Sequence, residues 1–401
     1  MARSDQPAPS KARSRRYGVL EVLRVSFKLG LTSFGGPAAH LGYFYEEYVR
    51  KRKWIDDRSY ADLVALCQFL PGPASSQAGI GIGVIRAGVL GGIAAWLGFT
   101  LPSLIALTLF ALLINGFDIS SAGWIHGLKL VAVAIVAQAV WGMGQKLAAD
   151  RTRASIAVVT AAITLIWQSV VSQVLLIAAA GVLGFWLYRS AADEHAPSLH
   201  VAVSRKTAAG CLALFFALLI GLPLLRQVTQ LEWVAVLDSF YRAGSLVFGG
   251  GHVVLPLLER EVVPAGWVDK QDFLAGYGAA QAVPGPLFTF AGYVGAVWGG
   301  VFGAALATAA IFLPAFLLVL GALPFWNTLR SSPKAQGAMT GINAAVVGIL
   351  LAALYQPLWT TSILAPSDFA FSSVLFVLLV FWKTPPWVVV AAGALGGGLL
   401  W

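Results

Sequence analysis

Long apolar runs separated by short polar connections dominate the chain. The runs 92–114 and 207–225 contain no charged residue, and each matches the roughly 20 helical residues that cross a hydrocarbon layer. Similar runs recur throughout and predict an all-α polytopic membrane protein with about 13 membrane segments. We expect helical segments over residues 18–34, 38–50, 59–70, 74–90, 92–114, 122–147, 154–169, 172–188, 207–226, 232–248, 252–263, 271–283, 287–301, 302–325, 335–355, 367–383 and 385–401.

An internal repeat divides the chain into two homologous halves, 18–188 and 232–401. With an offset of 214, a first set of residues recurs: Gly30, Phe34, Gly35, Gly36, Leu41 and Glu47 match Gly244, Phe248, Gly249, Gly250, Leu255 and Glu261. After one deletion, a second set recurs: Trp54, Asp56, Gln68, Pro71, Gly72 and Pro73 match Trp267, Asp269, Gln281, Pro284, Gly285 and Pro286. The matches are ordered and include tryptophan and proline, which chance similarity between apolar runs would not supply.

The segment between the halves, 189–231, combines a polar linker with a helix that has no partner in either half. If each half crosses the membrane an even number of times, this helix inverts the second half. Inverted repeats are typical of secondary transporters. The basic segment 1–17 has no apolar region directly behind it, so we expect a cytoplasmic N-terminus and no cleaved signal peptide.

The charges of two repeat-related loops support an inverted arrangement. Loop 50–58 has five basic and two acidic residues, whereas its mate 259–272 has two basic and four acidic residues. Cytoplasmic loops of membrane proteins carry an excess of lysine and arginine. We therefore expect the first loop on the cytoplasmic side of the inner membrane and the second on the other side. The net charge of +9 then reflects topology and does not indicate nucleic-acid binding.

Composition excludes the common enzyme classes. The chain is 58% hydrophobic and 11% charged, against about 25% charged in soluble domains. It contains no P-loop, no G-x-S-x-G and no H-E-x-x-H motif. Cys67 and Cys211 have neither metal nor disulfide spacing. The sequence predicts a protein that is not an enzyme and uses no cofactor or metal, with membrane lipid as its surroundings.

The two Pro-Gly-Pro segments, 71–73 and 284–286, predict broken or re-entrant helices. Proline removes a backbone donor and clashes with the preceding turn, and glycine releases helix geometry. Such backbone is tolerated at membrane depth only when it is buried or lines a cavity. The new helix that follows would direct its N-terminal N–H groups at the break, where they favour an anion. The hydroxyl and amide residues there are candidate ligands: Ser75, Ser76, Gln77 and Thr289. A simple kink between packed helices is the alternative.

The Phe-Gly-Gly motifs are less specific. Glycine pairs commonly mark close helix approach in membranes, which accounts for Gly35, Gly36, Gly249 and Gly250. Their position at the end of each repeat's first helix makes them candidate site residues. His252 lies beside the second motif, and the repeat-matched Gln68 and Gln281 lie just before the Pro-Gly-Pro segments; all three are candidates.

Charges within apolar segments are costly and commonly functional. Lys28 aligns with Arg242, and this pair is our candidate for neutralising an anionic substrate. Glu47 aligns with Glu261, and either carboxylate could carry a coupled proton, with salt bridges to nearby cations as the alternative. Arg86 and Lys129 have no charged repeat mates, and their roles stay open.

At these residues the sequence resembles the chromate ion transporter family in its long, two-domain form. The resemblance rests on FGGP at 34–37, QFLPGPASSQAG at 68–79, FGGGHVVLP at 248–256 and QAVPGP at 281–286. It implies export of chromate driven by the proton motive force, giving chromate resistance, with sulfate as a similar oxyanion. Other oxyanions, a passive anion channel, a membrane scaffold or sensor, and a homodimeric assembly stay open.

Overall fold

The computed structural model describes residues 11–34, 36–115, 123–167, 170–188, 203–247, 253–326 and 332–401. Within these ranges every regular element is a helix. Five stretches are long and apolar enough to cross a membrane: Ala74–Leu113, Gly123–Leu147, Arg205–Thr229, Leu287–Phe325 and Pro333–Ser362. The polytopic all-α prediction is confirmed at this level, and the figure of 13 segments stays a prediction.

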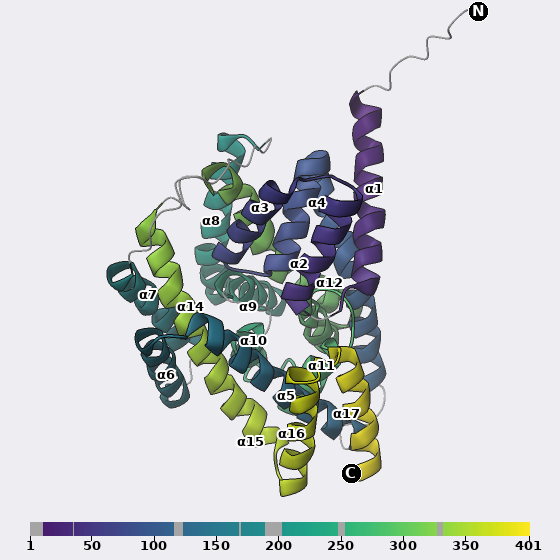
Figure 1. The fold of residues 1–401 in the computed structure, drawn as a ribbon, viewed down its shortest axis with the longest axis vertical. Helices are drawn as coiled ribbons and strands as arrows, with labels where there is room; N and C mark the ends of the chain where they lie inside the picture. Colours follow the sequence, from purple (N-terminus) through teal and green to yellow (C-terminus); the bar gives the residue numbers. More distant parts are fainter. Residues whose placement is uncertain are drawn as a thin grey trace, which may run out of the picture.

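The elements of the first half follow the expected order (Figure 1). The segment expected at 38–50 is a short α-helix followed by a π-helical turn, and the first helix begins within the expected N-terminal segment. The elements are α1 (Lys11–Thr32), α2 (Gly36–Phe44), the π-helix η1 (Tyr45–Lys51), α3 (Asp57–Phe69), α4 (Ala74–Asn115), α5 (Gly123–Leu147), α6 (Arg151–Ile166) and α7 (Val170–Leu187).

The unpaired helix α8 (Arg205–Thr229) leads into the same series in the second half. Its elements are α9 (Glu232–Leu246), α10 (Val254–Val262), α11 (Lys270–Ala280), the 3₁₀ turn η3 (Leu287–Thr289), α12 (Phe290–Ala322), the 3₁₀ turn η4 (Leu323–Phe325), α14 (Pro333–Ala353), η5 (Leu354–Trp359), α15 (Thr360–Ser362), α16 (Pro366–Val380) and α17 (Pro386–Leu400).

Both α4 and α12 contain a sharp turn that folds them into helical hairpins. The backbone leaves helical geometry at Ala87 and Gly88 in α4, and at Gly299 and Gly300 in α12. The two arms of the first hairpin touch through glycine, because a Cβ on Gly83 would lie 2.3 Å from the carbonyl oxygen of Gly91. These turns fall where the sequence predicted one segment to end and the next to begin.

The two halves exchange their last two helices. Helices α6 and α7 of the first half pack on α14 of the second, and α16 and α17 of the second half pack on α5 of the first (Figure 1). Because α14 is the repeat mate of α5, the exchange is reciprocal. This is the pattern of two units related by a two-fold axis, and it means that neither half is a self-contained domain.

Small residues allow these exchanged helices to approach closely. Gly123 and Gly127 of α5 meet Gly393 and Gly397 of α17. The repeat-related contact brings Gly337 and Gly341 of α14 against Ala180 and Gly184 of α7. Spacings of four residues between small side chains are a known mode of helix association in membranes.

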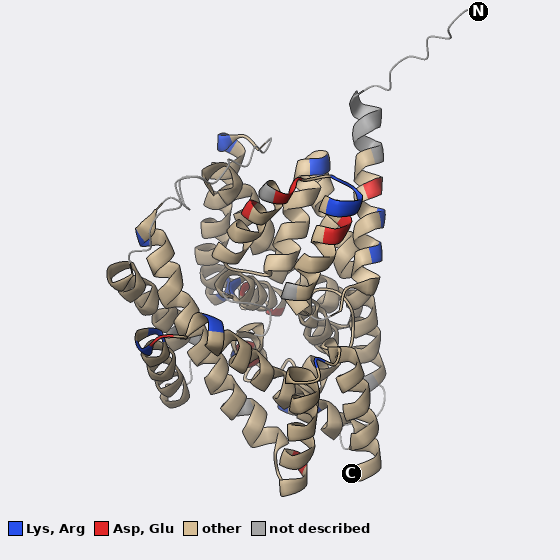
Figure 2. Ribbon diagram, in the orientation of Figure 1, with Lys and Arg blue, Asp and Glu red and all other residues tan. Residues whose placement is uncertain are grey.

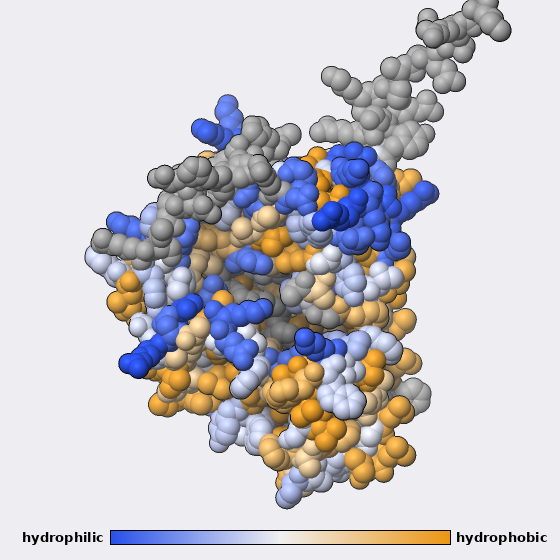
Figure 3. Space-filling view, in the orientation of Figure 1, coloured by the Kyte–Doolittle hydropathy of each residue, from blue (hydrophilic) through white to orange (hydrophobic). Residues whose placement is uncertain are grey.

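Charged and apolar side chains are unevenly distributed over the molecule. Charged segments gather at the upper end beside α1 and are sparse toward the lower end (Figure 2). Orange, hydrophobic atoms cover much of the lower part of the face shown in Figure 3. Large exposed side chains such as Phe216, Ile220 and Leu224 lie on α8. Only 11% of the most apolar stretch of this helix is buried inside the protein. This exposed apolar surface fits lipid as the solvent.

Substitution at the α5–α17 contact tests the exchanged packing. A Cβ on Gly127 would lie 2.0 Å from the carbonyl oxygen of Gly393, whereas a Cβ on Gly144 of the same helix meets nothing within 4 Å. We expect Gly127→Ala to lower the free energy of unfolding by about 1–3 kcal/mol. Gly144→Ala should leave the free energy unchanged or raise it, because alanine favours helix. Thermal unfolding in detergent measures both, and equal midpoints would contradict the contact.

Candidate functional site

The Pro-Gly-Pro segments form two breaks between helices, as the sequence predicts. α3 ends at Phe69 before the first break, and α4 begins at Ala74. α11 ends at Ala280 before the second break, which continues through η3 into α12. Gly72 and Gly285 have φ angles of +118° and +107°. Side chains other than hydrogen strongly disfavour these angles, so glycine is required at the centre of each break.

Each break is bonded to the opposite half of the molecule. The N–H of Gly72 donates to the carbonyl oxygen of Val247, just after α9, at 2.6 Å. The N–H of Gly285 donates to the carbonyl oxygen of Ser33, just after α1, at 3.0 Å. Ser33 and Val247 are repeat mates, and so are the two glycines. The two bonds therefore form a reciprocal pair that ties each broken helix to the first helix of the other repeat.

The polar residues after each break are buried. The amide Nε2 of Gln77 donates to the carbonyl oxygen of Pro71 at 2.8 Å, and the hydroxyl of Thr289 donates to that of Pro286 at 2.7 Å. Ser75 Oγ lies 3.3 Å from Nδ1 of His40. The Oγ atom of Ser76 and the Oε1 atom of Gln77 are buried without a hydrogen-bond partner. Of the predicted ligands, Gln77 and Thr289 stabilise the breaks through hydrogen bonds. The Ser76 hydroxyl and the Gln77 amide oxygen have unused hydrogen-bonding capacity.

A cavity of about 980 Å³ adjoins the second break. Its walls come from the chain after α1, the second half of α5, the Pro-Gly-Pro segment 284–286 and the connection between α16 and α17. The polar and charged lining residues are Ser33, His40, Tyr43, Gln138, Gln145, Lys146, Gln281, Lys383 and Thr384. Neither aspartate nor glutamate occurs among the described residues that line it.

Three lining residues have buried polar atoms without a partner in the described structure. These atoms are Oγ of Ser33, Nε2 of His40 and Nε2 of Gln281. Buried polar groups are nearly always hydrogen-bonded, to protein or to water. Three unpartnered polar groups therefore lie on residues that line one cavity.

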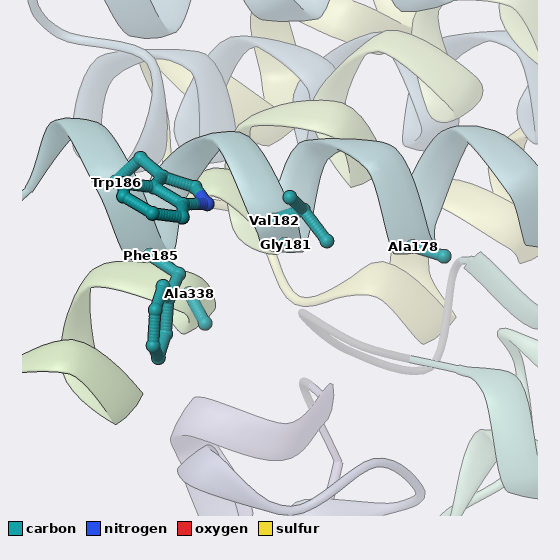
Figure 4. Close-up of a pocket in the computed structure, with 6 residues that line it drawn as sticks. All are labelled: Ala178, Gly181, Val182, Phe185, Trp186 and Ala338. Carbon is teal, nitrogen blue, oxygen red and sulfur yellow. The ribbon is translucent and has the colours of Figure 1, made fainter.

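The second cavity has a different character. It is a groove of about 430 Å³ lined by Ala178, Gly181, Val182, Phe185 and Trp186 of α7 and by Ala338 of α14 (Figure 4). No lining side chain is charged, so this groove offers an ion no compensation for its lost hydration.

The predicted cations Lys28 and Arg242 lie in different surroundings. Arg242 belongs to an ion-pair cluster in which its Nη2 lies 2.7 Å from Asp238 Oδ2 and 3.1 Å from Glu261 Oε1. Arg226 of α8 also contacts both carboxylates, at 3.2 and 3.5 Å. Lys28 is exposed on α1, and among the described residues no ion pair joins it to this cluster. The structure does not bring the two cations together around one described cavity.

The repeat-matched Glu47 and Glu261 both form salt bridges, which is the alternative to proton coupling that the sequence left open. Glu47 is buried and pairs with Arg52 at 2.8 Å, and Arg52 also contacts Glu21 at 3.3 Å. Glu21 in turn pairs with Arg86 at 3.1 Å. Lys129, buried on α5, donates to Gln271 Oε1 at 3.1 Å. Arg86 and Lys129 thus have partners across helices.

The remaining candidates are divided by the structure. Gly36 lines the cavity together with Gln281 and Gly285. Gln68 is exposed at the end of α3. Pro71, Pro73, Pro284 and Pro286 form the breaks. The predicted residues Gly35, Gly249, Gly250 and His252 lie outside the described residues.

Sequence reasoning missed Lys146 and Lys383 as site residues. Neither has a charged repeat mate. Lys146 lies in the last turn of α5 and Lys383 follows α16, and lysine at the end of an apolar helix ordinarily marks the membrane surface. Their common feature is that both line the same cavity, where α5 lies opposite the α16–α17 connection. That pairing follows from the exchange of helices between halves and leaves no signal in a single sequence.

Comparison with known proteins supports the duplication, because one family model matches both halves of the chain. Residues 20–185 and 234–398 match the model of the chromate transporter family. The chain belongs to the chromate transporter family. Both matched stretches lie inside the two expected repeats, whose outer boundaries stay predictions.

Named relatives of this family are similar over nearly the whole chain. A chromate transport protein of Pseudomonas aeruginosa is 30% identical over 389 residues, covering 92% of this chain and 89% of the relative. One of Cupriavidus metallidurans is 27% identical over 390 residues, covering 95% and 93%. A probable chromate transport protein of Synechococcus elongatus is 27% identical over 402 residues, covering 96% of each. No solved structure matches the chain.

Replacing the glycine of the second break tests its geometry. In Gly285→Ala the Cβ would lie 2.8 Å from Ser103 Oγ at a φ of +107°. We expect a loss of about 1–3 kcal/mol in the free energy of unfolding from backbone strain. Gly42→Ala in α2 is the control, since its Cβ meets nothing within 4 Å. Thermal midpoints measured in detergent compare the two, and an unshifted Gly285→Ala variant would rule out the required conformation.

Proposed function

We propose that this protein is a secondary transporter of chromate in the cytoplasmic membrane. The observation that carries the proposal is the cavity beside the second break, which has two lysines and no carboxylate among its described lining residues. A dianion that leaves water needs cations and hydrogen-bond donors, and nearby carboxylates would repel it. Kinship with named chromate transport proteins supports chromate as the particular oxyanion.

We propose further that the two halves have inverted topology and move against one another in alternating access. The reciprocal backbone bonds and exchanged helices support a two-fold relation between the halves. The charge difference between loops 50–58 and 259–272 supports an axis in the membrane plane, with a cytoplasmic N-terminus. In this proposal the protein exports chromate, uses the proton motive force and confers resistance.

Transport into inside-out vesicles tests the activity directly. We expect labelled chromate to accumulate in vesicles containing the protein, because inside-out uptake corresponds to export from the cell. An uncoupler should abolish accumulation against a gradient, and excess sulfate should compete more strongly than phosphate. Vesicles with empty vector are the control. Equilibration that resists the uncoupler would indicate a passive channel. Stronger competition by sulfate than by unlabelled chromate would indicate a sulfate transporter. Absence of flux would contradict both a transporter and a channel.

Neutralising the two repeat-matched cations tests the sites proposed for them. We expect Lys28→Gln with Arg242→Gln to reduce chromate uptake at least tenfold, because both would stabilise the anion along its path. Arg242→Lys separates charge from ion-pair geometry, since it can keep one contact with Asp238 or Glu261. Arg24→Gln, an exposed cation on α1, is the control. Full transport by a folded double variant would reject both residues as substrate ligands.

The repeat-matched glutamates are proposed to carry the coupled proton. We expect Glu47→Gln and Glu261→Gln to lose uphill chromate accumulation while keeping exchange of internal for external chromate, because glutamine cannot release a proton. Glu46→Gln is the matched control, as Glu46 is exposed and contacts Lys51 at 3.5 Å. If uphill accumulation and exchange decline in parallel, the glutamates act through their salt bridges and not as proton carriers.

A further inference from the structure

We infer that the cavity beside the second break is a single oxyanion-binding site per chain, with Lys146 and Lys383 at its mouth and Ser33, His40 and Gln281 below them. This deepens the proposed function and rests on it for the identity of the anion. The site differs from the pair Lys28 and Arg242 that the repeat suggests. Its ligands come from both halves, so it exists only where the halves meet.

The two lysines carry the positive charge of this site. Both are exposed, both line the cavity, and neither side chain forms an ion pair or a hydrogen bond within the described structure. Their charge is therefore available to an incoming anion. By contrast, Arg242, Arg226 and Arg52 are each paired with carboxylates.

The backbone holds Lys383 in an unusual conformation. Its φ is +54°, a left-handed value that glycine or asparagine ordinarily supplies after a helix. The N–H of Thr384 donates to the carbonyl oxygen of Leu378 at 3.0 Å, and Pro385 and Pro386 follow directly. The lysine is thus fixed between the end of α16 and the start of α17. A non-glycine residue held at positive φ is a recurrent feature of functional sites.

The floor of the cavity supplies hydrogen-bond donors. The Ser33 hydroxyl and the Gln281 amide nitrogen can donate to an oxyanion, and both are buried without a partner. If Nδ1 of His40 accepts from the Ser75 hydroxyl at 3.3 Å, its Nε2 carries a hydrogen and donates as well. An anion would then exchange its hydration for lysine charge at the mouth and for these donors at the floor.

The lining is only partly repeated in the other half, which predicts one site per chain. At the repeat offset of 214, Ser33 corresponds to Val247 and His40 to Val254, and both valines are buried. Lys146 corresponds to Thr360 at the same offset. Gln281 is repeated as Gln68, which is exposed at the end of α3. The serine, the histidine and the lysine have no like counterpart in the other half.

Calorimetric titration of the purified full chain with chromate, and separately with sulfate, tests the site. We expect one anion per chain, and about tenfold weaker binding for Lys146→Gln or Lys383→Gln, since hydrogen bonds to charged groups contribute about 1.5–3 kcal/mol. The double variant should bind more weakly still, and Lys146→Arg should retain most of the affinity. Lys206→Gln, an exposed lysine at the start of α8, is the matched control and should bind like wild type.

A second pair of variants tests the contribution of the floor residues to binding separately from that of the lysines at the mouth. Gln281→Leu and His40→Asn should weaken binding while unchanged thermal midpoints show that the chain is folded. Wild-type affinity in the folded lysine double variant, or two anions per chain, would overturn the inference.

Vesicle uptake by the same variants distinguishes failure of the site from failure of the proposed function. Wild-type protein that binds chromate through these lysines but transports none would retain the site and reject the transporter. Wild-type protein that transports chromate equally well after both lysines are replaced would reject the site and retain the transporter.

Discussion

The structure depends on satisfying backbone hydrogen bonds where two helices are broken inside a membrane protein. An N–H without a partner in low-dielectric surroundings costs several kcal/mol. Here Gly72 and Gly285 meet that demand with carbonyl oxygens of the opposite half, at Val247 and Ser33. The solution requires glycine at each break and an available carbonyl oxygen just after α1 and α9. It also makes the two halves mutually dependent, because each completes the other's hydrogen bonding.

The exchanged helices follow the same logic at a larger scale. α6 and α7 cover α14, and α16 and α17 cover α5, through glycines that let the backbones approach. Such packing resists separation of the halves, because small residues let the helix backbones lie in close contact. Any movement that alternates access must preserve the two reciprocal backbone bonds or replace them.

Much of this architecture could be predicted from the sequence, because helix breakers and apolar period are local signals. The Pro-Gly-Pro breaks, the turns near Gly88 and Gly300 and the unpaired α8 all lie where the pattern places them. The cavity could not be predicted, because it forms between α5 and the α16–α17 connection, residues more than 200 apart in sequence. The repeat also directed attention to matched charges. Arg242 is matched yet paired with Asp238, whereas Lys383 is unmatched and unpaired.

Duplication and specialisation act on different parts of the molecule. Backbone features recur in both copies: each break bonds to the chain after the first helix of the other half, and each half has a hairpin turn. Side chains that line the cavity are not constrained in this way. The positions of Ser33 and His40 are occupied by valines in the second copy. The frame thus recurs in both halves, while most of the polar lining of the cavity occurs once. An anion bound by residues of both halves would then feel every relative movement of the halves, which is the coupling that transport requires.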